Sequence, residues 1–480
     1  MVSIAASDIE GGAARAAYRL HKGLVSLGHE ASIIVKSKRS DDPTVHSVGW
    51  VPTANQCEEL GRLDLIQQNH IDKQRTPISN TYFSLGYPGC DLSGHPLVKS
   101  ADIIHLHWVS GFQSVFSIAR LHALGKRLVW TLHDQRPFTG GCHFSAGCTG
   151  YKERCASCPQ LNEDPFRLTQ ANLADLRAIL PLKHLTIVAP SRWLADCARQ
   201  SALFRKSRIE TIAYGVETDV FTPTPKAEAR RKLELDPQAT YLLFGADYGS
   251  EIRKGFGPMI QALVHCLSEP AFKQRVQRGE IMILCFGNPN PAAASLPIPF
   301  RSLGYLASDE QLSLVYSAAD LFLLPSLEDN LPNTMLEAMS CGTPVVGFAV
   351  GGIPELVATG FTGKLVPAGD TRQFGEAILS LLGSPREEAV LRHNCRRLIE
   401  RDYSLTKQAG HYLKLYEELL SEERNSLIQS AMTDAADISV VPLITRMGPR
   451  LQKLDARRFS PDGKRGGLLS PFRRWLRPWC

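Results

Sequence analysis

The sequence lacks any apolar run of about 18 residues, the length that a transmembrane helix needs. It also lacks a basic segment followed by an apolar stretch and a small-residue cleavage site near residue 1. We therefore expect a cytoplasmic protein without a secretory leader or a membrane-spanning helix. Cysteines of a cytoplasmic chain stay reduced, so a cluster of thiols favours a metal site over disulfides.

Excess charge is also absent from most of the chain. The net charge is +6, but residues 446–480 carry ten Lys and Arg against two Asp, which leaves −2 elsewhere. A near-neutral globular part argues against a specific nucleic-acid partner. In the basic segment, Phe472, Trp475 and Trp479 stand among arginines, a composition typical of contact with an anionic membrane surface. A solvated tail or weak nucleic-acid binding fits the same composition.

Short apolar runs alternate with helical patterns along the chain. The first series lies at 2–6, 31–35, 102–108, 128–133, 185–191 and 208–215, and the second lies at 240–246, 281–287, 320–326, 343–349 and 363–370. Such alternation predicts parallel β-α-β units, and a proline-containing break at 216–229 separates the two series. We predict an α/β fold with Rossmann-like domains at 1–222 and 223–424, the second ending in a helix at 411–423. Residues 425–480 form the predicted tail. We expect ligands to bind at the carboxyl ends of the strands.

The segment LLPSLEDNLPNTMLEAMSCGTPVVGF at 323–348 combines a strand, an acidic loop and a short helix. Backbone N–H groups where the helix begins, near Asn333, suit phosphate oxygens. Glu337, one turn later, is placed to reach a ribose diol, and Glu328 and Asp329 are placed to accept hydrogen bonds from sugar hydroxyls. An ordinary β-α-β turn with solvated acids has the same pattern.

Two cations follow the strand predicted at 240–246. In FGADYGSEIRKGF, Arg253 and Lys254 precede a glycine and a helical pattern. Two fixed positive charges after a strand suit an anionic ligand or leaving group. A solvated pair of cations where a helix begins is the alternative.

Smaller signals lie at the ends of other strands. Gly11 and Gly12 follow the first strand and allow a ligand to approach the backbone closely. His133 ends the strand at 128–133 and can donate or accept a hydrogen bond to a ligand, although a strand-end histidine with internal partners is the alternative. Gly351 and Gly352 form a turn that suits a pocket wall.

The chain resembles the retaining glycosyltransferases of family 4, which have the GT-B architecture of two facing Rossmann-like domains. EAMSCGTPVV at 337–346 matches a family motif, and Lys254 with its following glycine matches the diphosphate-binding pair. Asp329, separated from the second acid by seven residues, stands where the family has Glu, with Glu328 one place earlier. Asn330, Leu331, Pro332 and Asn333 replace the usual Gly-Phe-Gly-Leu, and Ala246 replaces an arginine.

The resemblance implies transfer of a sugar, with retention and without a catalytic metal, from a nucleotide-diphosphate sugar to a glycan or polyprenyl-linked acceptor. It implies a role in surface-polysaccharide synthesis. The alternatives are another GT-B enzyme, such as a phosphorylase or epimerase, and a non-catalytic binding protein. The residues implied to act on the sugar are His133, Glu328, Asp329 and Glu337, and those implied to hold the donor are Gly11, Gly12, Arg253, Lys254, Asn330, Leu331, Asn333, Gly351 and Gly352.

A cysteine-rich loop at 139–161 directly follows the His133 strand. Its cysteines have the spacing C-x5-C-x6-C-x2-C and are Cys142, Cys148, Cys155 and Cys158. Four thiolates suit a tetrahedral structural zinc ion, with His143 as a substitute ligand; paired disulfides and free thiols are the alternatives. Some family 4 enzymes of surface-polysaccharide synthesis, of the colanic-acid type, have a similar stretch. We expect the loop on the acceptor side of the cleft, with a structural role.

Overall fold

The computed structural model describes residues 1–48, 65–78, 81–87, 89–245, 251–287, 295–306 and 308–430. Ala246 and the basic segment at 446–480, on which two of the sequence interpretations depend, lie outside the described residues. Within the described part of the chain, no helix is long and apolar enough to cross a membrane.

The first half of the chain folds around a seven-stranded sheet, with every neighbouring pair parallel, in the order β3-β2-β1-β4-β5-β6-β7. Its central strands are buried along most of their lengths, as expected of apolar strands covered on both faces. The strands are β1 (Val2–Ser7), β2 (Ser32–Ser37), β3 (Val45–Ser47), β4 (Ile103–Leu106), β5 (Arg127–Thr131), β6 (Leu185–Ala189) and β7 (Arg208–Thr211). The helices are α1 (Gly12–Ser26), α3 (Pro96–Ser100), α4 (Val115–His122), α5 (Leu168–Ile179) and α6 (Arg192–Gln200).

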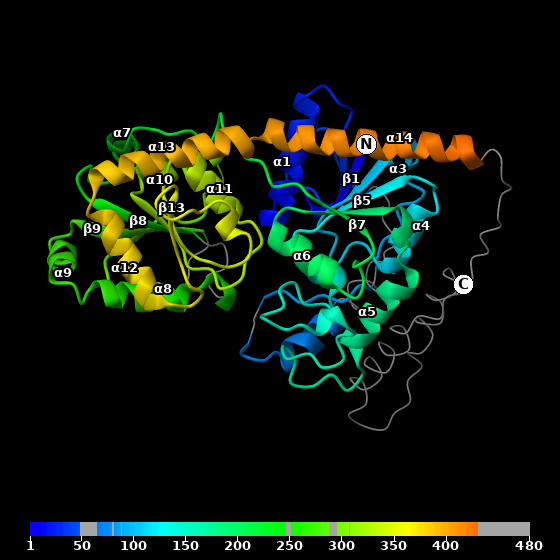
Figure 1. Ribbon diagram of the computed structural model, residues 1–480, viewed down its shortest axis with the longest axis horizontal. Coiled ribbons are helices and arrows are strands. Elements are labelled where there is room, and N and C mark those ends of the chain that lie inside the picture. The colour runs from blue at the N-terminus through cyan, green and yellow to red at the C-terminus, as the bar shows by residue number, and fades with distance from the viewer. Residues whose placement is uncertain are drawn as a thin grey trace.

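The second half of the chain also folds around a parallel sheet, which has six strands in the order β10-β9-β8-β11-β12-β13. These strands are β8 (Thr240–Gly245), β9 (Ile281–Phe286), β10 (Phe300–Ser302), β11 (Leu321–Leu324), β12 (Val345–Phe348) and β13 (Gly363–Val366). The helices are α7 (Lys226–Lys232), α8 (Phe256–Cys266), α9 (Pro270–Gln277), α10 (Asp309–Ala318), α11 (Asn333–Ser340), α12 (Thr371–Leu382) and α13 (Pro385–Asp402). The two domains lie side by side (Figure 1), which confirms the predicted fold class.

The last described helix, α14 (Leu405–Ser430), returns to the first sheet after α13 has run along the second domain (Figure 1). Its buried side chains include Tyr412, Leu415 and Leu419, which join a cluster with Leu20 and Leu24 of α1. The helix is longer than the predicted one at 411–423 and extends into the predicted tail. Because its apolar face is complementary to the first domain, the helix completes that domain and not the second.

Candidate functional site

A cavity of about 140 Å³ opens between the two domains where their strands end. The first domain contributes the turn between β1 and α1, and the second domain contributes the ends of β8 and β9 and the first turns of α11. Its lining includes Gly11, Gly12, Arg15, Gly245, Phe286, Gly287, Tyr305, Asn333 and Glu337. Predicted donor residues from both halves of the chain thus meet in one cavity, at the edge where parallel sheets bind ligands.

Glu337 lines this cavity from α11, but both of its carboxylate oxygens have protein partners. Oε1 lies 2.8 Å from a guanidinium nitrogen of Arg19 on α1, and Oε2 accepts a hydrogen bond of 2.8 Å from the Tyr316 hydroxyl. Arg19 also lies 2.7 Å from Glu217. The arginine therefore joins two buried acids, and the carboxylate of Glu337 is held rigidly at the cavity wall.

Asp329 and the two predicted cations form one cluster after β11. Asp329 Oδ2 lies 2.8 Å from Lys254 Nζ and 3.4 Å from an Arg253 guanidinium nitrogen. Burial alone raises the pKa of Asp329, but the charges of Lys254 and Arg253 lower the pKa overall. Gly255 has φ +75°, and a Cβ there would lie 1.7 Å from the Pro325 carbonyl oxygen, so only glycine fits after Lys254.

Glu328 faces away from this cluster, toward the cysteine-rich loop of the other domain. Its carboxylate accepts hydrogen bonds from the Ala146 N–H at 2.9 Å and from the Ser145 hydroxyl at 3.3 Å. Burial raises the pKa of Glu328, although these hydrogen bonds oppose the rise. The sequence leaves open which of these two acids contacts the sugar. In the structure, Asp329 lies with the cations, whereas Glu328 connects the two domains.

His133 lies buried beyond the end of β5, with both ring nitrogens bonded inside the protein. Nδ1 lies 2.7 Å from the Tyr214 hydroxyl, and Nε2 lies 3.2 Å from His107. Burial lowers the pKa of His133 to about 4, so the ring is neutral at pH 7. Its carbonyl oxygen accepts a hydrogen bond from Asn330. This geometry matches the alternative of a strand-end histidine with internal partners, and it offers no ring nitrogen for a sugar hydroxyl.

The segment that departs from the family pattern forms the seam between the domains. Asn330 accepts a hydrogen bond of 2.6 Å from Ser191, and Asn333 donates one of 2.8 Å to the Gly12 carbonyl oxygen. Leu331 is buried in the core of the second domain and does not line the cavity.

Gly351 and Gly352 pack directly under this seam. A Cβ at Gly351 would lie 1.6 Å from the Asp329 carbonyl oxygen, and one at Gly352 would lie 2.1 Å from that of Asn330. The Gly352 N–H also donates to Asn330 at 2.7 Å. These glycines therefore position the acidic loop by packing against its backbone.

Comparisons with known proteins agree with this architecture. Residues 10–220 match the model described as Glycosyltransferase Family 4, and residues 242–384 match the one described as Glycosyl transferases group 1. The chain carries the paired domains of the GT-B glycosyltransferases. The two matches divide it near the predicted boundary, within the stretch between β7 and β8.

Curated relatives of this GT-B chain include D-inositol 3-phosphate glycosyltransferases. That of Thermobispora bispora is 29% identical over 226 residues, which are 44% of this chain and 51% of the relative. That of Mycobacterium sp. (strain KMS) is 33% identical over 188 residues, which are 37% of this chain and 40% of the relative. The chain thus spans about half the length of the curated relatives it matches.

Solved structures share the fold at low sequence identity. Sucrose-phosphate synthase from Thermosynechococcus elongatus has a TM-score of 0.58 at 18% identity, covering 88% of this chain and 99% of that one. Anabaena Alr3699/HepE in complex with UDP has a TM-score of 0.56 at 16% identity, covering 87% and 99%. WaaG, a glycosyltransferase involved in lipopolysaccharide biosynthesis, has 0.56 at 19% identity, covering 85% and 98%.

A second and larger cavity of the GT-B cleft, about 690 Å³, was not expected from the sequence. It shares Gly11 and Gly12 with the first cavity and extends over the first domain. Its other lining residues include Glu10, Gln68, Asp72, Arg75, Thr81, Tyr82, Trp108 and Glu251. In the sequence, the feature that could have indicated this cavity was Trp108, a large aromatic residue shortly after β4. The remaining lining residues come from segments that only folding brings together.

Proposed function

We propose that this protein is a retaining glycosyltransferase that moves a sugar from a nucleotide-diphosphate donor to a glycan or lipid-linked acceptor. The observation that carries the proposal is the cleft itself, in which the start of α11 and the β1–α1 turn meet between two family-matched domains. The retaining course and the role in polysaccharide synthesis are proposed from the resemblance to family 4.

The smaller cavity suits the nucleoside of the donor. Asn333 begins α11 at its wall, where helix N–H groups attract phosphate oxygens, and Glu337 stands one turn further on. The Anabaena protein of the same fold was solved with UDP, and with UDP-glucose. On that ground we propose a uridine nucleotide as the first donor to test.

Lys254 and Arg253 supply the charge that the reaction needs. As the glycosidic bond of the donor breaks, negative charge grows on the departing diphosphate, and preorganised cations stabilise that charge. Asp329 holds both cations in place, which lowers the cost of ordering them when the donor binds. The carboxylate of Asp329 is also the acid placed to orient hydroxyls of the transferred sugar.

The larger cavity suits the acceptor. Trp108 and Tyr82 give it aromatic walls, and aromatic faces pack well against sugar rings. Among the described residues that line it, the acids Glu10, Asp72 and Glu251 outnumber the single cation, Arg75. This balance favours an uncharged polyol, such as the terminal sugar of a glycan, over an acceptor whose accepting end carries phosphate.

The first test is a thermal-shift panel of UDP-, GDP-, ADP- and CMP-sugars, followed by assays of nucleotide release with glycan, polyprenyl-linked and D-inositol 3-phosphate acceptors. Binding of one nucleotide class, with acceptor-dependent release of the diphosphate and an unchanged anomeric configuration in the product, supports the proposal. Binding without turnover across the acceptor panel favours a sugar-nucleotide-binding protein. Release that depends on inorganic phosphate favours a phosphorylase, and conversion of the sugar without an acceptor favours an epimerase.

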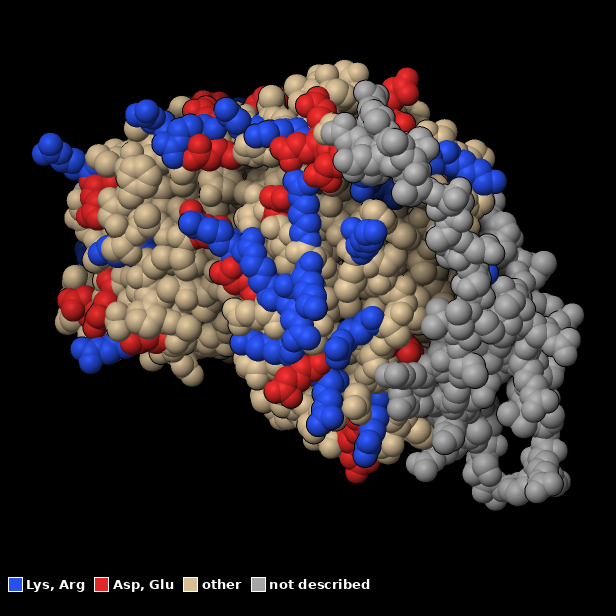
Figure 2. Space-filling model, turned by 45° about the vertical axis from the view of Figure 1, so that its right-hand side comes forward, with Lys and Arg blue, Asp and Glu red and all other residues tan. Residues whose placement is uncertain are grey.

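We also propose that the protein acts at the inner face of the cytoplasmic membrane. A band of Lys and Arg side chains runs down one face (Figure 2), and the sequence of residues 446–480 carries a further net charge of +8. Basic surfaces of this kind bind anionic headgroups, each cation near the surface contributing about 1 kcal/mol. A lipid-linked acceptor makes such attachment useful.

A further inference from the structure

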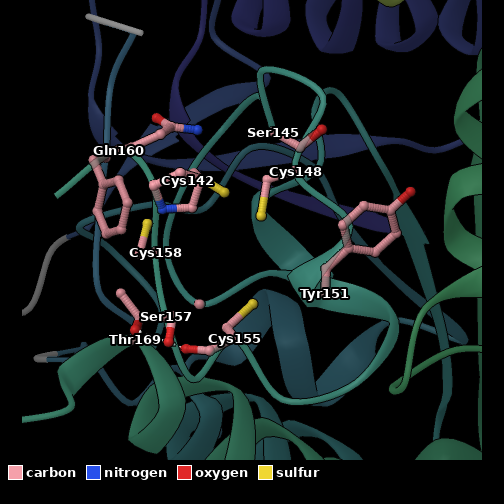
Figure 3. Close-up of a pocket in the computed structure, with 12 residues that line it drawn as sticks. Cys142, Ser145, Cys148, Tyr151, Cys155, Ser157, Cys158, Gln160 and Thr169 are labelled. Atoms are coloured by element: carbon pink, nitrogen blue, oxygen red, sulfur yellow. Dashed lines mark hydrogen bonds between the residues drawn. The ribbon is translucent and has the colours of Figure 1, made fainter. Parts of the chain in front are cut away.

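The four clustered cysteines line one small cavity. Its volume is about 20 Å³, and its other lining residues include Phe83, Gly140, Ser145 and Tyr151. Figure 3 shows the side chains of Cys142, Cys148, Cys155 and Cys158 around this space. A space of roughly 10–15 Å³ holds one water-sized guest, so the cavity accommodates a single small ion.

One backbone N–H group of the loop donates to a clustered sulfur atom: that of Gly150 donates to Cys148 Sγ at 3.3 Å. Burial raises the pKa values of the Cys158 and Cys155 thiols to about 11 and about 12, and it outweighs backbone groups of Gln160 and Gly140, which act to lower them. A neutral thiol is a weak acceptor, whereas a thiolate is a strong one that such donors stabilise. Burial therefore favours neutral thiols at this cluster, and the positive charge of a bound metal ion is what would convert them to thiolates.

Neighbouring side chains hold and polarise this cluster. The Thr139 hydroxyl donates to the Cys142 carbonyl oxygen at 2.7 Å, and burial raises the pKa of the Cys142 thiol well above its usual value. The guanidinium of Arg75 acts electrostatically on Cys158 and Cys142, and it offsets part of the −2 charge that a zinc ion with four thiolates carries. The predicted substitute ligand, His143, has both nitrogens engaged, by Asp134 at 2.6 Å and by Ser84 at 2.8 Å. The ligand set therefore consists of the four cysteines.

We propose that Cys142, Cys148, Cys155 and Cys158 bind one Zn²⁺ and that the ion holds the loop segment that contacts Glu328 across the cleft. Within the described ranges, no three His, Cys, Asp or Glu side chains already surround an ion position. The proposed binding therefore requires the four sulfurs to move toward one point. The Sγ atoms of Cys148 and Cys155 lie 3.4 and 3.9 Å from the point where a Cβ of Gly150 would stand. Binding releases the protons of the four thiols to solvent.

The metal site is connected to the cleft through a short stretch of backbone. Ser145 and Ala146, which hydrogen-bond Glu328, lie between the ligands Cys142 and Cys148. Ala146 has φ +49°, a left-handed conformation that a non-glycine residue adopts at a cost. Zinc therefore stabilises the strained turn that presents two hydrogen-bond donors to Glu328. Its role is to support the contact between the two domains, and it takes no part in the chemical reaction.

The test measures metal directly on the full chain. The protein, expressed with added zinc and passed through a desalting column, is expected to carry about one zinc per chain by inductively coupled plasma mass spectrometry. Exchange with Co²⁺ is expected to produce the visible and near-ultraviolet absorption of tetrahedral cobalt–thiolate. Cys155→Ser is expected to lose both signals, whereas Cys285→Ser, a partly buried cysteine of β9, keeps them.

Two results overturn the zinc site, and neither depends on the glycosyltransferase assay. One is a wild-type protein without zinc or a cobalt spectrum whose four thiols react with a thiol reagent on denaturation. The other is an intact mass four hydrogens below the reduced chain, which indicates two disulfides. The link to Glu328 has its own test: chelation is expected to lower the melting temperature of wild type more than that of Glu328→Ala. Equal shifts overturn that link.

Discussion

At the residue scale, a chain of buried polar side chains runs from the cleft to α14. His133 bonds Tyr214 and His107, while His105 bonds the hydroxyls of Thr131 and Tyr416. Burial lowers the pKa of His133 to about 4 and that of His105 to about 3, and it lowers the pKa of His107 well below its usual value. These rings are neutral in the folded protein, and both ring nitrogens of His133 and of His105 have partners.

The histidine chain makes stability depend on pH. The folded pKa values lie below the unfolded value of about 6.5, so the unfolded state gains protons first as pH falls. The free energy of unfolding is expected to fall between pH 6.5 and 4, by about 1.4 kcal/mol per pH unit for each histidine. Urea denaturation across this range measures the slope. His105→Gln is expected to reduce this slope by the contribution of one histidine. His411→Gln, which changes an exposed residue of α14, is expected to leave the slope unchanged. Equal slopes in wild type and both variants would contradict the assignment of the pH dependence to the buried histidines.

Under the proposed function, we expect donor binding to depend most on Lys254. Removing a charge-assisted hydrogen bond to a diphosphate costs about 1.5–3 kcal/mol. Lys254→Ala is therefore expected to weaken binding of the donor nucleotide about 10- to 100-fold, measured by isothermal titration calorimetry. Lys232→Ala, an exposed lysine of α7 that pairs with Glu228, is the matched control. Unaltered affinity in Lys254→Ala would place the diphosphate elsewhere.

At the element scale, α14 belongs to a domain distant from it in sequence. The chain passes from α13 to α14 beside Val216, whose N–H donates to the Tyr403 carbonyl oxygen at 2.9 Å. The two crossings between domains therefore lie next to each other. The apolar face of α14 then covers the first sheet, and Tyr416 meets His105 inside it. This packing joins the chain's last described helix to its first strands.

Truncating this face is expected to destabilise the first domain. Leu415→Ala removes a buried side chain and leaves a cavity, which costs about 2–5 kcal/mol. Between residues 1 and 430, every tryptophan lies before residue 200, so tryptophan fluorescence reports mainly the first domain during urea denaturation. Lys414→Ala, one residue away and exposed, is expected to be neutral. A fluorescence transition that stays at the wild-type urea concentration in Leu415→Ala would argue that α14 stabilises the other domain.

At the scale of the whole molecule, polar contacts close the two domains on each other. Arg19 of α1 joins Glu217 and Glu337, and all three side chains are at most 6% exposed. Arg15, one turn earlier on α1, pairs with Asp309 at 2.6 Å with both side chains more than a quarter exposed. One helix thus makes a buried and a half-buried ion pair to the opposite domain.

This pair of arginines permits a matched test of domain closure. Arg19→Ala leaves two buried carboxylates without a counter-charge, which is expected to cost about 3–5 kcal/mol of unfolding free energy. Arg15→Ala breaks a more exposed pair and is expected to cost about 0–1 kcal/mol. Chemical denaturation of both variants measures the difference. Similar losses in the two variants would show that burial does not distinguish the pairs.

Attachment to membranes is also a property of the whole molecule. A chain ending at residue 430 loses the segment with a charge of +8. It is expected to bind anionic vesicles more weakly than the full chain at low salt, with a difference that shrinks as salt rises, because surface charge is screened. Vesicle co-sedimentation measures the effect, and neutral vesicles are the control. Unchanged binding after truncation would exclude the segment as the anchor.

The sequence by itself determined the two parallel sheets, because apolar strand patterns and helix signals act locally. It also indicated that Gly11, Gly12, Asn333 and Glu337, which line the cavity between the domains, lie near strand ends, since parallel strands place their carboxyl ends together. Only the tertiary structure decided which partners these residues have. Local pattern does not specify that Glu328 meets the cysteine-rich loop, that His133 bonds internally, or that α14 covers the first sheet. Each depends on contacts between segments far apart in sequence, whose geometry is set by the packing of whole domains.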